Sequence, residues 1–270
     1  MLTSPAHASP PVGAALREWR QRRRLSQLDL AVQAEISTRH LSFMETGRAS
    51  PSREMVLRLA EQLQVPLRER NALLVAAGYA PMFSQRSLED PAMQAARRAM
   101  ELVLTGHEPY PALAVDRHWQ MVASNRAVAP LLTGVAAALL APPVNVLRLS
   151  LHPDGLAPRI VNYDEWRAHL LDRLRRQIGL SADPVLAALL EELDSYPAPA
   201  SSGSAHAAAQ DFAGVAVPLQ LRTDAGVLSF ISTVTVFGTP VDVTLSELAL
   251  ETFFPADAAT AAALARLSGG

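Results

Sequence analysis

Two short helices joined by a tight turn are predicted near the N-terminus, and this pattern constrains the fold more than any other feature. Ser26 is a favourable N-cap, and Asp29 three residues later completes a capping box for a helix over Gln27–Ala34. A turn is predicted at Ala34–Ile36, and a second helix over Thr38–Glu45. Two helices joined by a three-residue turn, the second short and polar on one side, are typical of a helix-turn-helix.

Residues around this pair predict a small helical domain. Ser37 is placed to cap the second helix, and Gly47 supplies the left-handed residue that often follows a helix end. Further helices are predicted over Gly13–Arg24, after Pro51-Ser52, and over Leu67–Ala77. We therefore expect a mainly α-helical domain over residues 13–82.

The run SQLDLAVQAEISTRHLSFMETGRASPS resembles the Xre/Cro/lambda-repressor family. The matching positions are Ser26, Gln27, Leu30, Ala31, Leu41, Ser42, Glu45, Gly47, Pro51 and Ser52. One departure is Glu35, since the family usually has Gly in the turn and a Glu adopts that geometry at some cost. The resemblance implies a DNA-binding transcriptional regulator that acts on a double-stranded operator. The alternative is a protein-interaction domain with the same fold.

The second helix of such a unit lies in the major groove, with its first residues facing the base edges. Here those residues are Ser37, Thr38 and Arg39, with His40 beside them. Arg39 has the geometry for a bidentate contact to guanine, and a phosphate contact is its alternative role.

The family resemblance also implies contacts to the DNA backbone. By position in the family pattern, Gln27 and Ser42 would contact phosphates, and Arg48 would reach the backbone after the recognition helix. Phe43 lies on the outer side of that helix, where it would either touch a thymine methyl group or serve in packing.

Charge and composition favour the same division of the chain. Residues 1–82 carry a net charge of +4 and residues 83–270 a net charge of −6, although the whole chain has a net charge of only −2. There is no Cys, which excludes disulfides, cysteine-ligated zinc and thiol catalysis. All 24 basic residues are Arg, so a Walker-A loop and a lysine Schiff base are excluded as well.

The second part of the chain predicts an α/β domain of the α+β kind. Short strands are predicted over Ala112–Asp116 and Gln120–Ser124, and a hairpin over Val215–Arg222 and Gly226–Phe237. A further range, Asn145–His152, fits a strand or a helix equally well. Helices are predicted over Pro91–Leu104, Asp164–Ile178 and Pro184–Leu193, from the capping pair Thr244 and Glu247 through Phe253, and over Asp257–Leu267. Strands, helices and strands again in this order favour a PAS-like antiparallel sheet.

Three phrases in this part resemble the ligand-binding domain of MmyB-like regulators, which is PAS-like and follows a helix-turn-helix. They are VDRHWQMVASNRAVAPLL, PVNVLRLSLHPDGLAPRIVNYDEW and FISTVTVFGTPVDVTLSELALETFFP. Together, the two resemblances cover the chain from about Gly13 to Ala265. The second one implies a sensor domain that holds a small apolar ligand of fatty-acid type.

Several residues are candidates for that ligand site. Trp119 and Trp166 are candidates to line or cover a pocket, and the alternative is that they and the hairpin residues pack on the neighbouring helices. Phe230 belongs to a set of hairpin residues predicted to share one face of the sheet, namely Leu228, Phe230, Val234 and Val236. Asn145 and Arg148 are polar residues in apolar surroundings, so they would either orient a ligand carboxylate or serve in packing and a structural salt bridge.

No catalytic constellation is found, so we expect a regulator rather than an enzyme, without a metal or a cofactor. The seven His residues form no close pair of the metal-binding kind, and neither a Gly-x-Ser-x-Gly nor a Gly-x-Gly-x-x-Gly motif is present. Two alternatives stay open: a regulator whose second domain binds a protein partner, and an enzyme fused to a DNA-binding module.

We expect a disordered tail over residues 1–12, a connecting helix within 83–108 and the sensor domain over 109–270. The first residues lack the apolar core of a signal peptide, and no apolar run reaches the length of a membrane span. We therefore expect a cytoplasmic protein that makes no membrane contact and acts as a homodimer on DNA.

Overall fold

The computed structural model describes residues 11–199, 217–238, 240 and 242–268. Contacts divide the chain into two compact units, the first extending to Gln85 and the second taking up most of the chain from Arg86 onward. The tail expected over residues 1–12 lies outside the described residues except at 11 and 12, and the first helix already begins at Val12.

The first unit is built from short helices whose starts are set by serine caps. They are α1 Val12–Arg22, α2 Gln27–Gln33, α3 Thr38–Glu45, α4 Arg53–Gln62 and α5 Leu67–Ala76. The hydroxyls of Ser26, Ser37 and Ser52 each accept a backbone N–H from three residues further on, which satisfies a donor that the helix itself leaves unpaired. Ser26 and Asp29 form the predicted capping box.

Close packing of α1 on α3 holds this unit together. Leu16, Leu41 and Met44 are fully buried. A Cβ atom added to Gly13 would lie 2.2 Å from the carbonyl oxygen of Met44, so only glycine permits this approach of the two backbones. Leu28 is 61% exposed, because α2 turns Leu30 and Ala31 inward instead.

The second unit combines one sheet with helices. Its strands are β1 Ala112–Val115, β2 Met121–Ser124, β3 Leu219–Thr223, β4 Gly226–Val236 and β5 Ala249–Pro255. Its α-helices are α6 Gln94–Gly106, α7 Ala137–Leu140, α8 Val146–Leu151, α9 Tyr163–Ser181, α10 Pro184–Asp194, α11 Val243–Ser246 and α12 Ala258–Ser268. Short 3-10 turns are η1 Pro91–Met93, η2 Ala129–Leu132 and η3 Ala157–Arg159.

All strand pairs in the sheet are antiparallel, in the order β2-β1-β5-β4-β3. The last strand in the chain, β5, therefore lies in the middle, with Glu251 paired to Leu113 of β1 on one side and to Val234 of β4 on the other. This confirms the predicted architecture, a helical helix-turn-helix region followed by an α+β domain with an antiparallel sheet.

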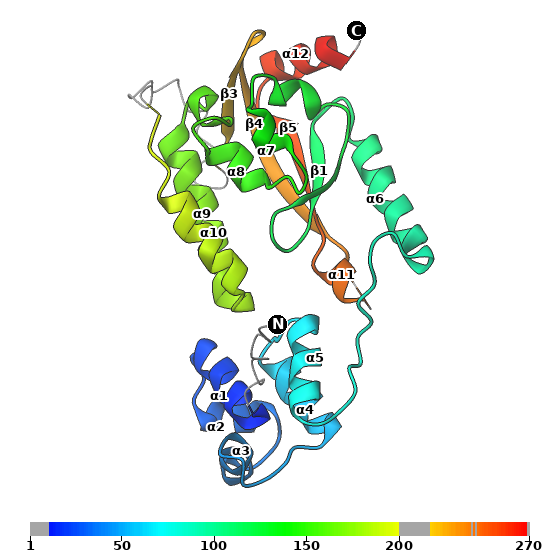
Figure 1. The fold of residues 1–270 in the computed structure, drawn as a ribbon, viewed down its shortest axis with the longest axis vertical. Coiled ribbons are helices and arrows are strands. Elements are labelled where there is room, and N and C mark those ends of the chain that lie inside the picture. The colour runs from blue at the N-terminus through cyan, green and yellow to red at the C-terminus, as the bar shows by residue number, and fades with distance from the viewer. Residues whose placement is uncertain (1–10, 200–216, 239, 241, 269–270) are drawn as a thin grey trace, which may run out of the picture. The chain divides into compact units, whose positions relative to one another are not determined.

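Helices cover both faces of the sheet (Figure 1). On one face, Met100 and Leu104 of α6 pack on Ala112, Ala114 and Leu250. On the other face, α8, α9 and α10 enclose the larger apolar cluster, to which the side chains of Trp119, Trp166, Leu174 and Phe230 belong.

The structure corrects one prediction for the second unit and adds detail to two others. The helix expected from Thr244 through Phe253 ends at Ser246, and Ala249–Pro255 is a strand because neighbours on both sides supply its hydrogen bonds. The ambiguous range around Asn145 is helix α8. In the hairpin, Leu228 and Phe230 are buried, but Val234 and Val236 are 46% and 61% exposed, because they lie beyond the residues that β3 pairs with. Residues 215 and 216 of the hairpin lie outside the described residues.

Candidate nucleic-acid interface and ligand pocket

The turn between α2 and α3 contains a strained residue. Glu35 has a φ of 54°, in the left-handed region that glycine favours. Its N–H donates to the carbonyl oxygen of Val32 at 3.2 Å, and the N–H of Ile36 donates to Ala31 at 2.9 Å, which together end α2 as a glycine would. The departure from the family pattern is therefore accommodated without loss of the turn.

The first turn of α3 presents the predicted base-reading residues to solvent. Ser37, Arg39 and His40 are exposed, and Thr38 is half-buried. The Ser37 hydroxyl accepts the N–H of His40 at 3.1 Å, so its position is set by the helix start. These residues stand together at one end of a short helix, as contact with base edges would require.

Two arginines flank one aromatic ring on the outer side of α3. The guanidinium carbons of Arg39 and Arg48 lie 5.3 Å and 5.9 Å from the centre of the Phe43 ring, within cation–π range. Both arginines are exposed. Phe43 therefore serves to hold two cations on the same surface.

Gln27, expected to contact a phosphate, is tied to the interior of the unit. Its side-chain amide donates to Glu45 at 2.8 Å, and Arg20 donates two bonds to the same carboxylate, at 2.6 and 2.9 Å. Burial alone would raise the pKa of Glu45, but the hydrogen bonds from Arg20 and Gln27 outweigh it and hold this pKa below its ordinary value. Ser42, the other predicted phosphate contact, is half-buried on α3. Both phosphate roles remain predictions.

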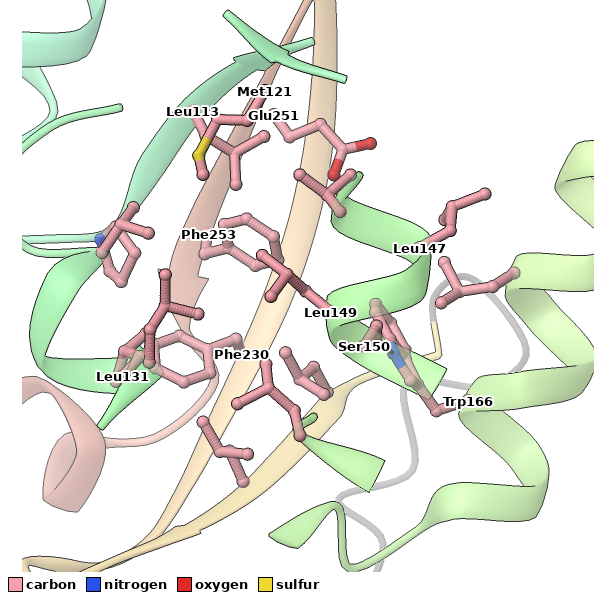
Figure 2. A pocket seen from close by; sticks show the side chains of 18 of the residues that line it. Leu113, Met121, Leu131, Leu147, Leu149, Ser150, Trp166, Phe230, Glu251 and Phe253 are labelled. Atoms are coloured by element: carbon pink, nitrogen blue, oxygen red, sulfur yellow. Dashed lines mark hydrogen bonds between the residues drawn. The ribbon is translucent and has the colours of Figure 1, made fainter. Parts of the chain in front are cut away.

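An apolar pocket lies in the second unit between the sheet and helices α8 and α9 (Figure 2). It has a volume of about 90 Å³. Figure 2 shows Leu113, Met121 and Glu251 at one end, Phe253 and Leu149 in the middle, and Phe230, Ser150 and Trp166 towards the other end. Three of the five predicted ligand residues line it: Trp119, Trp166 and Phe230.

Trp119 occupies its wall position through an unusual backbone. Its φ is 65°, which is uncommon for a bulky residue and costs about 1–3 kcal/mol. The Asp116 carboxylate supports the turn by accepting the N–H groups of His118 and Gln120, at 2.8 and 2.9 Å. The indole N–H of Trp119 donates to Gln177 at 2.8 Å, so the ring presents its apolar surface to the pocket.

Trp166 is held in a similar way on α9. Its indole N–H donates to the Ser150 hydroxyl at 2.9 Å, and its ring stacks on His169 with centroids 5.5 Å apart. With both indole donors satisfied, the pocket wall is apolar over most of its area.

A charged pair stands at the end of the pocket near Leu113. Glu251 is only 7% exposed, and the Arg173 Nη1 atom lies 2.6 Å from its Oε1 atom. Arg173 in turn lies over the Trp119 ring, 4.3 Å from its centre. The sequence does not predict this pair, because its local signals favour a helix through Phe253, whereas the strand β5 places Glu251 on the same sheet face as Leu113.

Asn145 and Arg148, the two polar candidates, do not line the pocket. The Asn145 side chain caps α8 by accepting the N–H groups of Leu147 and Arg148, both at 3.1 Å. Arg148 forms a bidentate pair with Glu192 of α10, at 2.7 and 2.6 Å, and these bonds hold the pKa of Glu192 below its ordinary value. These contacts support the structural alternative for both residues, a helix cap for Asn145 and a salt bridge for Arg148, and a role of either in ligand binding stays a prediction.

The fold and these two surfaces define a transcription regulator with a DNA-binding helix-turn-helix domain and a ligand-binding domain. A family model described as the ligand-binding domain of MmyB-like transcription regulators matches residues 96–267, and a helix-turn-helix domain model matches residues 11–73. Because the first match covers more than half of the chain, the protein belongs to the family of MmyB-like transcription regulators.

Solved structures show more distant similarities. The crystal structure of the clp gene regulator ClgR from Corynebacterium glutamicum is 25% identical, with a TM-score of 0.23, over 38% of this chain and 99% of that chain. An RNA-binding light-oxygen-voltage receptor is 14% identical, with a TM-score of 0.26, over 96% of this chain and 64% of that one. Scores this low do not show a shared overall arrangement. A comparison with curated proteins finds no match.

No helix in the described part of the chain has both the length and the apolar character needed to cross a membrane. Among the same residues, no group of three or more His, Asp or Glu side chains is arranged to hold a metal ion.

Proposed function

We propose that this regulator reads an operator through the first turn of α3 and that a small apolar ligand in the pocket changes its affinity for DNA. The observation that carries the proposal is the apolar pocket itself, walled by Trp119, Trp166 and Phe230 in a domain of a ligand-binding family. The DNA contacts proposed are Ser37, Thr38 and Arg39 to bases, and Gln27, Ser42 and Arg48 to the backbone.

An aliphatic ligand of fatty-acid-like type fits the apolar walls best. The open volume of about 90 Å³ is smaller than the engineered cavity of about 150 Å³ that binds benzene, so a long chain requires wall side chains to move. The alternative function is that the second unit binds a protein partner rather than a small molecule. A filled core with one large apolar patch would favour that alternative, whereas an internal cavity favours a small molecule.

The test is binding of decanol to the full-length protein. Binding is monitored by tryptophan fluorescence, because two of the three tryptophans line the pocket. Operator affinity is then measured with and without decanol, on a sequence obtained by binding-site selection. Leu149→Phe fills the middle of the pocket and should weaken decanol binding by at least about 10-fold.

Leu140→Phe is the matched control, because it is the same leucine-to-phenylalanine substitution at a residue of α7 that does not line the pocket. It should bind decanol as the natural protein does. If decanol and other aliphatic probes cause no change in fluorescence or unfolding temperature, and a pull-down recovers a protein bound to the second unit, the proposal is wrong and the alternative stands.

A further inference from the structure

We propose that Glu251 selects the polar group of the ligand, and that this group is a hydrogen-bond donor such as a hydroxyl rather than a carboxylate. The inference rests on the proposed function of the pocket and refines it: the aliphatic part of a fatty-acid-like ligand is kept, but its acidic head group is excluded from this end.

Glu251 occupies a position where a ligand would meet it. It lies on β5, the central strand, next to Leu113 of β1, and its carboxylate stands at the pocket end that Leu113 and Met121 also line (Figure 2). Among the described residues of the pocket wall, Glu251 alone carries a charge. Ser150 provides a neutral hydroxyl elsewhere on the wall, and that hydroxyl already accepts the N–H of Trp166.

The carboxylate has unused hydrogen-bonding capacity. Its side chain is 9% exposed, and its Oε1 atom is enclosed and receives no hydrogen bond of acceptable geometry from the described residues. A ligand group reaches this oxygen only when wall side chains move, as the small volume of the pocket already requires for a long chain. Arg173 Nη1 is 2.6 Å away, so the two groups form an ion pair whose angles are too poor for a hydrogen bond. A buried carboxylate with about four acceptor positions and one misaligned partner is incompletely satisfied.

This arrangement discriminates between ligand head groups. A hydroxyl donates to the unsatisfied carboxylate, and a hydrogen bond to a charged group is among the stronger ones. A ligand carboxylate would bring a second negative charge beside Glu251 in an apolar space, which is unfavourable both by repulsion and by loss of solvation.

Arg173 weakens that repulsion, because its positive charge lies beside Glu251, but it is not a free cation for a ligand carboxylate. Its guanidinium is held 4.3 Å over the centre of the Trp119 ring and is paired with Glu251. A ligand carboxylate that bound Arg173 would have to compete with Glu251 for it and leave Glu251 without its counter-ion.

The experiment compares decanol with decanoate on the full-length protein, at one ionic strength and neutral pH, by isothermal titration calorimetry. The two probes share an alkyl chain and differ in the head group. We expect decanol to bind at least about 10-fold more tightly than decanoate. This comparison needs no variant, so it stays decisive if a substitution at Glu251 prevents folding.

Variants then assign the preference to Glu251. Glu251→Gln removes the charge and adds a donor, so the ratio of the two affinities should fall to about 1 or reverse. The double variant Glu251→Gln with Arg173→Gln should show the same fall, which excludes a released Arg173 as its cause. Glu101→Gln is the matched control, because Glu101 is exposed on α6 and should leave the ratio unchanged.

The outcomes separate this inference from the proposed function. Equal affinities for the two probes, tighter binding of decanoate, or an unchanged ratio in Glu251→Gln each overturn the inference while ligand binding itself stands. Binding of neither probe overturns the proposed function and this inference with it.

Discussion

Arg39 and Arg48 contact the same Phe43 ring but should have different effects on DNA binding. Arg39 lies in the first turn of α3, where a directional contact to a base edge is expected. Arg39→Ala should therefore cost about 1–3 kcal/mol and relax base preference at one operator position. Binding-site selection with the variant checks this, and an unchanged preference would remove Arg39 from the base-reading set.

Arg48 follows α3 and is proposed to contact the DNA backbone. Arg48→Ala should weaken binding to all sequences alike. It should also reduce the slope of log affinity against log salt concentration by about 1, because one phosphate contact is lost. The measurement is operator affinity over a range of salt concentrations, with Arg39→Ala as the matched arginine-to-alanine comparison. A loss confined to one operator sequence would contradict the assignment.

The buried pair of Arg20 and Glu45 makes the first unit sensitive to acid. The folded protein holds the pKa of Glu45 below its ordinary value, so its contribution to stability is present above that value, about 4.3, and is lost as pH falls through the lowered pKa. Glu45→Gln leaves the buried Arg20 without its counter-ion and should destabilise the unit by about 3–5 kcal/mol at neutral pH.

Hydrogen-exchange mass spectrometry on peptides from α1 and α3, across a urea series at several pH values, measures both effects. The variant should lose part of the acid sensitivity of the natural protein. Glu18→Gln is the control, because Glu18 pairs with Arg22 on the surface of α1 and should change stability by less than about 1 kcal/mol. Equal effects of the two substitutions would show that burial of the pair is not what matters.

At the scale of elements, the turn between α2 and α3 carries strain that a substitution should release. Glu35→Gly introduces glycine, which tolerates a φ of 54°, and it should stabilise the first unit by about 1 kcal/mol. Glu61→Gly makes the same chemical change at an exposed position inside α4 and should destabilise by about 1 kcal/mol. Hydrogen-exchange mass spectrometry across a urea series, read on peptides from α2 and α4, gives the unfolding midpoint of each variant and so the sign of each effect. If Glu35→Gly does not raise the midpoint, Glu35 is unstrained.

The element β5 shows why local signals failed in one place. Thr244 and Glu247 have the spacing of a helix start, and the helix that forms ends at Ser246. From Ala249 onward, hydrogen bonds to β1 and β4 outweigh the local preference, because a central strand satisfies its backbone groups on both sides. The same pairing places Glu251 at the pocket.

At the scale of the whole molecule, we expect a homodimer on a palindromic operator. One recognition helix reads only a few base pairs, and two helices about 34 Å apart read two half-sites. The outer side of α6 is a candidate contact because Leu102 is 74% exposed there. Leu102→Glu should weaken the dimer in sedimentation experiments, whereas Val185→Glu, which places the same charge at a 51% exposed position on α10, should not.

A monomer both free in solution and on the operator would contradict this prediction. If the dimer is confirmed, a ligand acts on DNA binding only by favouring one arrangement of the dimer over another. A coupling of about 1–3 kcal/mol would change operator affinity by roughly 5–150-fold.

The sequence by itself determined the features that depend on neighbouring residues. The serine caps, the capping box, the turn before α3, and the alternation of the hairpin are local signals, and the structure contains each of them. Large apolar side chains in a domain without a catalytic constellation indicate a core or a pocket, and Trp119, Trp166 and Phe230, predicted as ligand residues, do line the pocket. Their contact with a ligand stays a prediction.

Only the tertiary structure decided the features that depend on residues far apart in the chain. Arg148 and Glu192 are separated by 44 positions, and their pairing engages Arg148 away from the pocket lining. Arg173 and Glu251 meet because α9 packs against the sheet at its central strand. No local pattern encodes such pairs, since their free energy depends on which side chains burial brings together and on how little water remains around them.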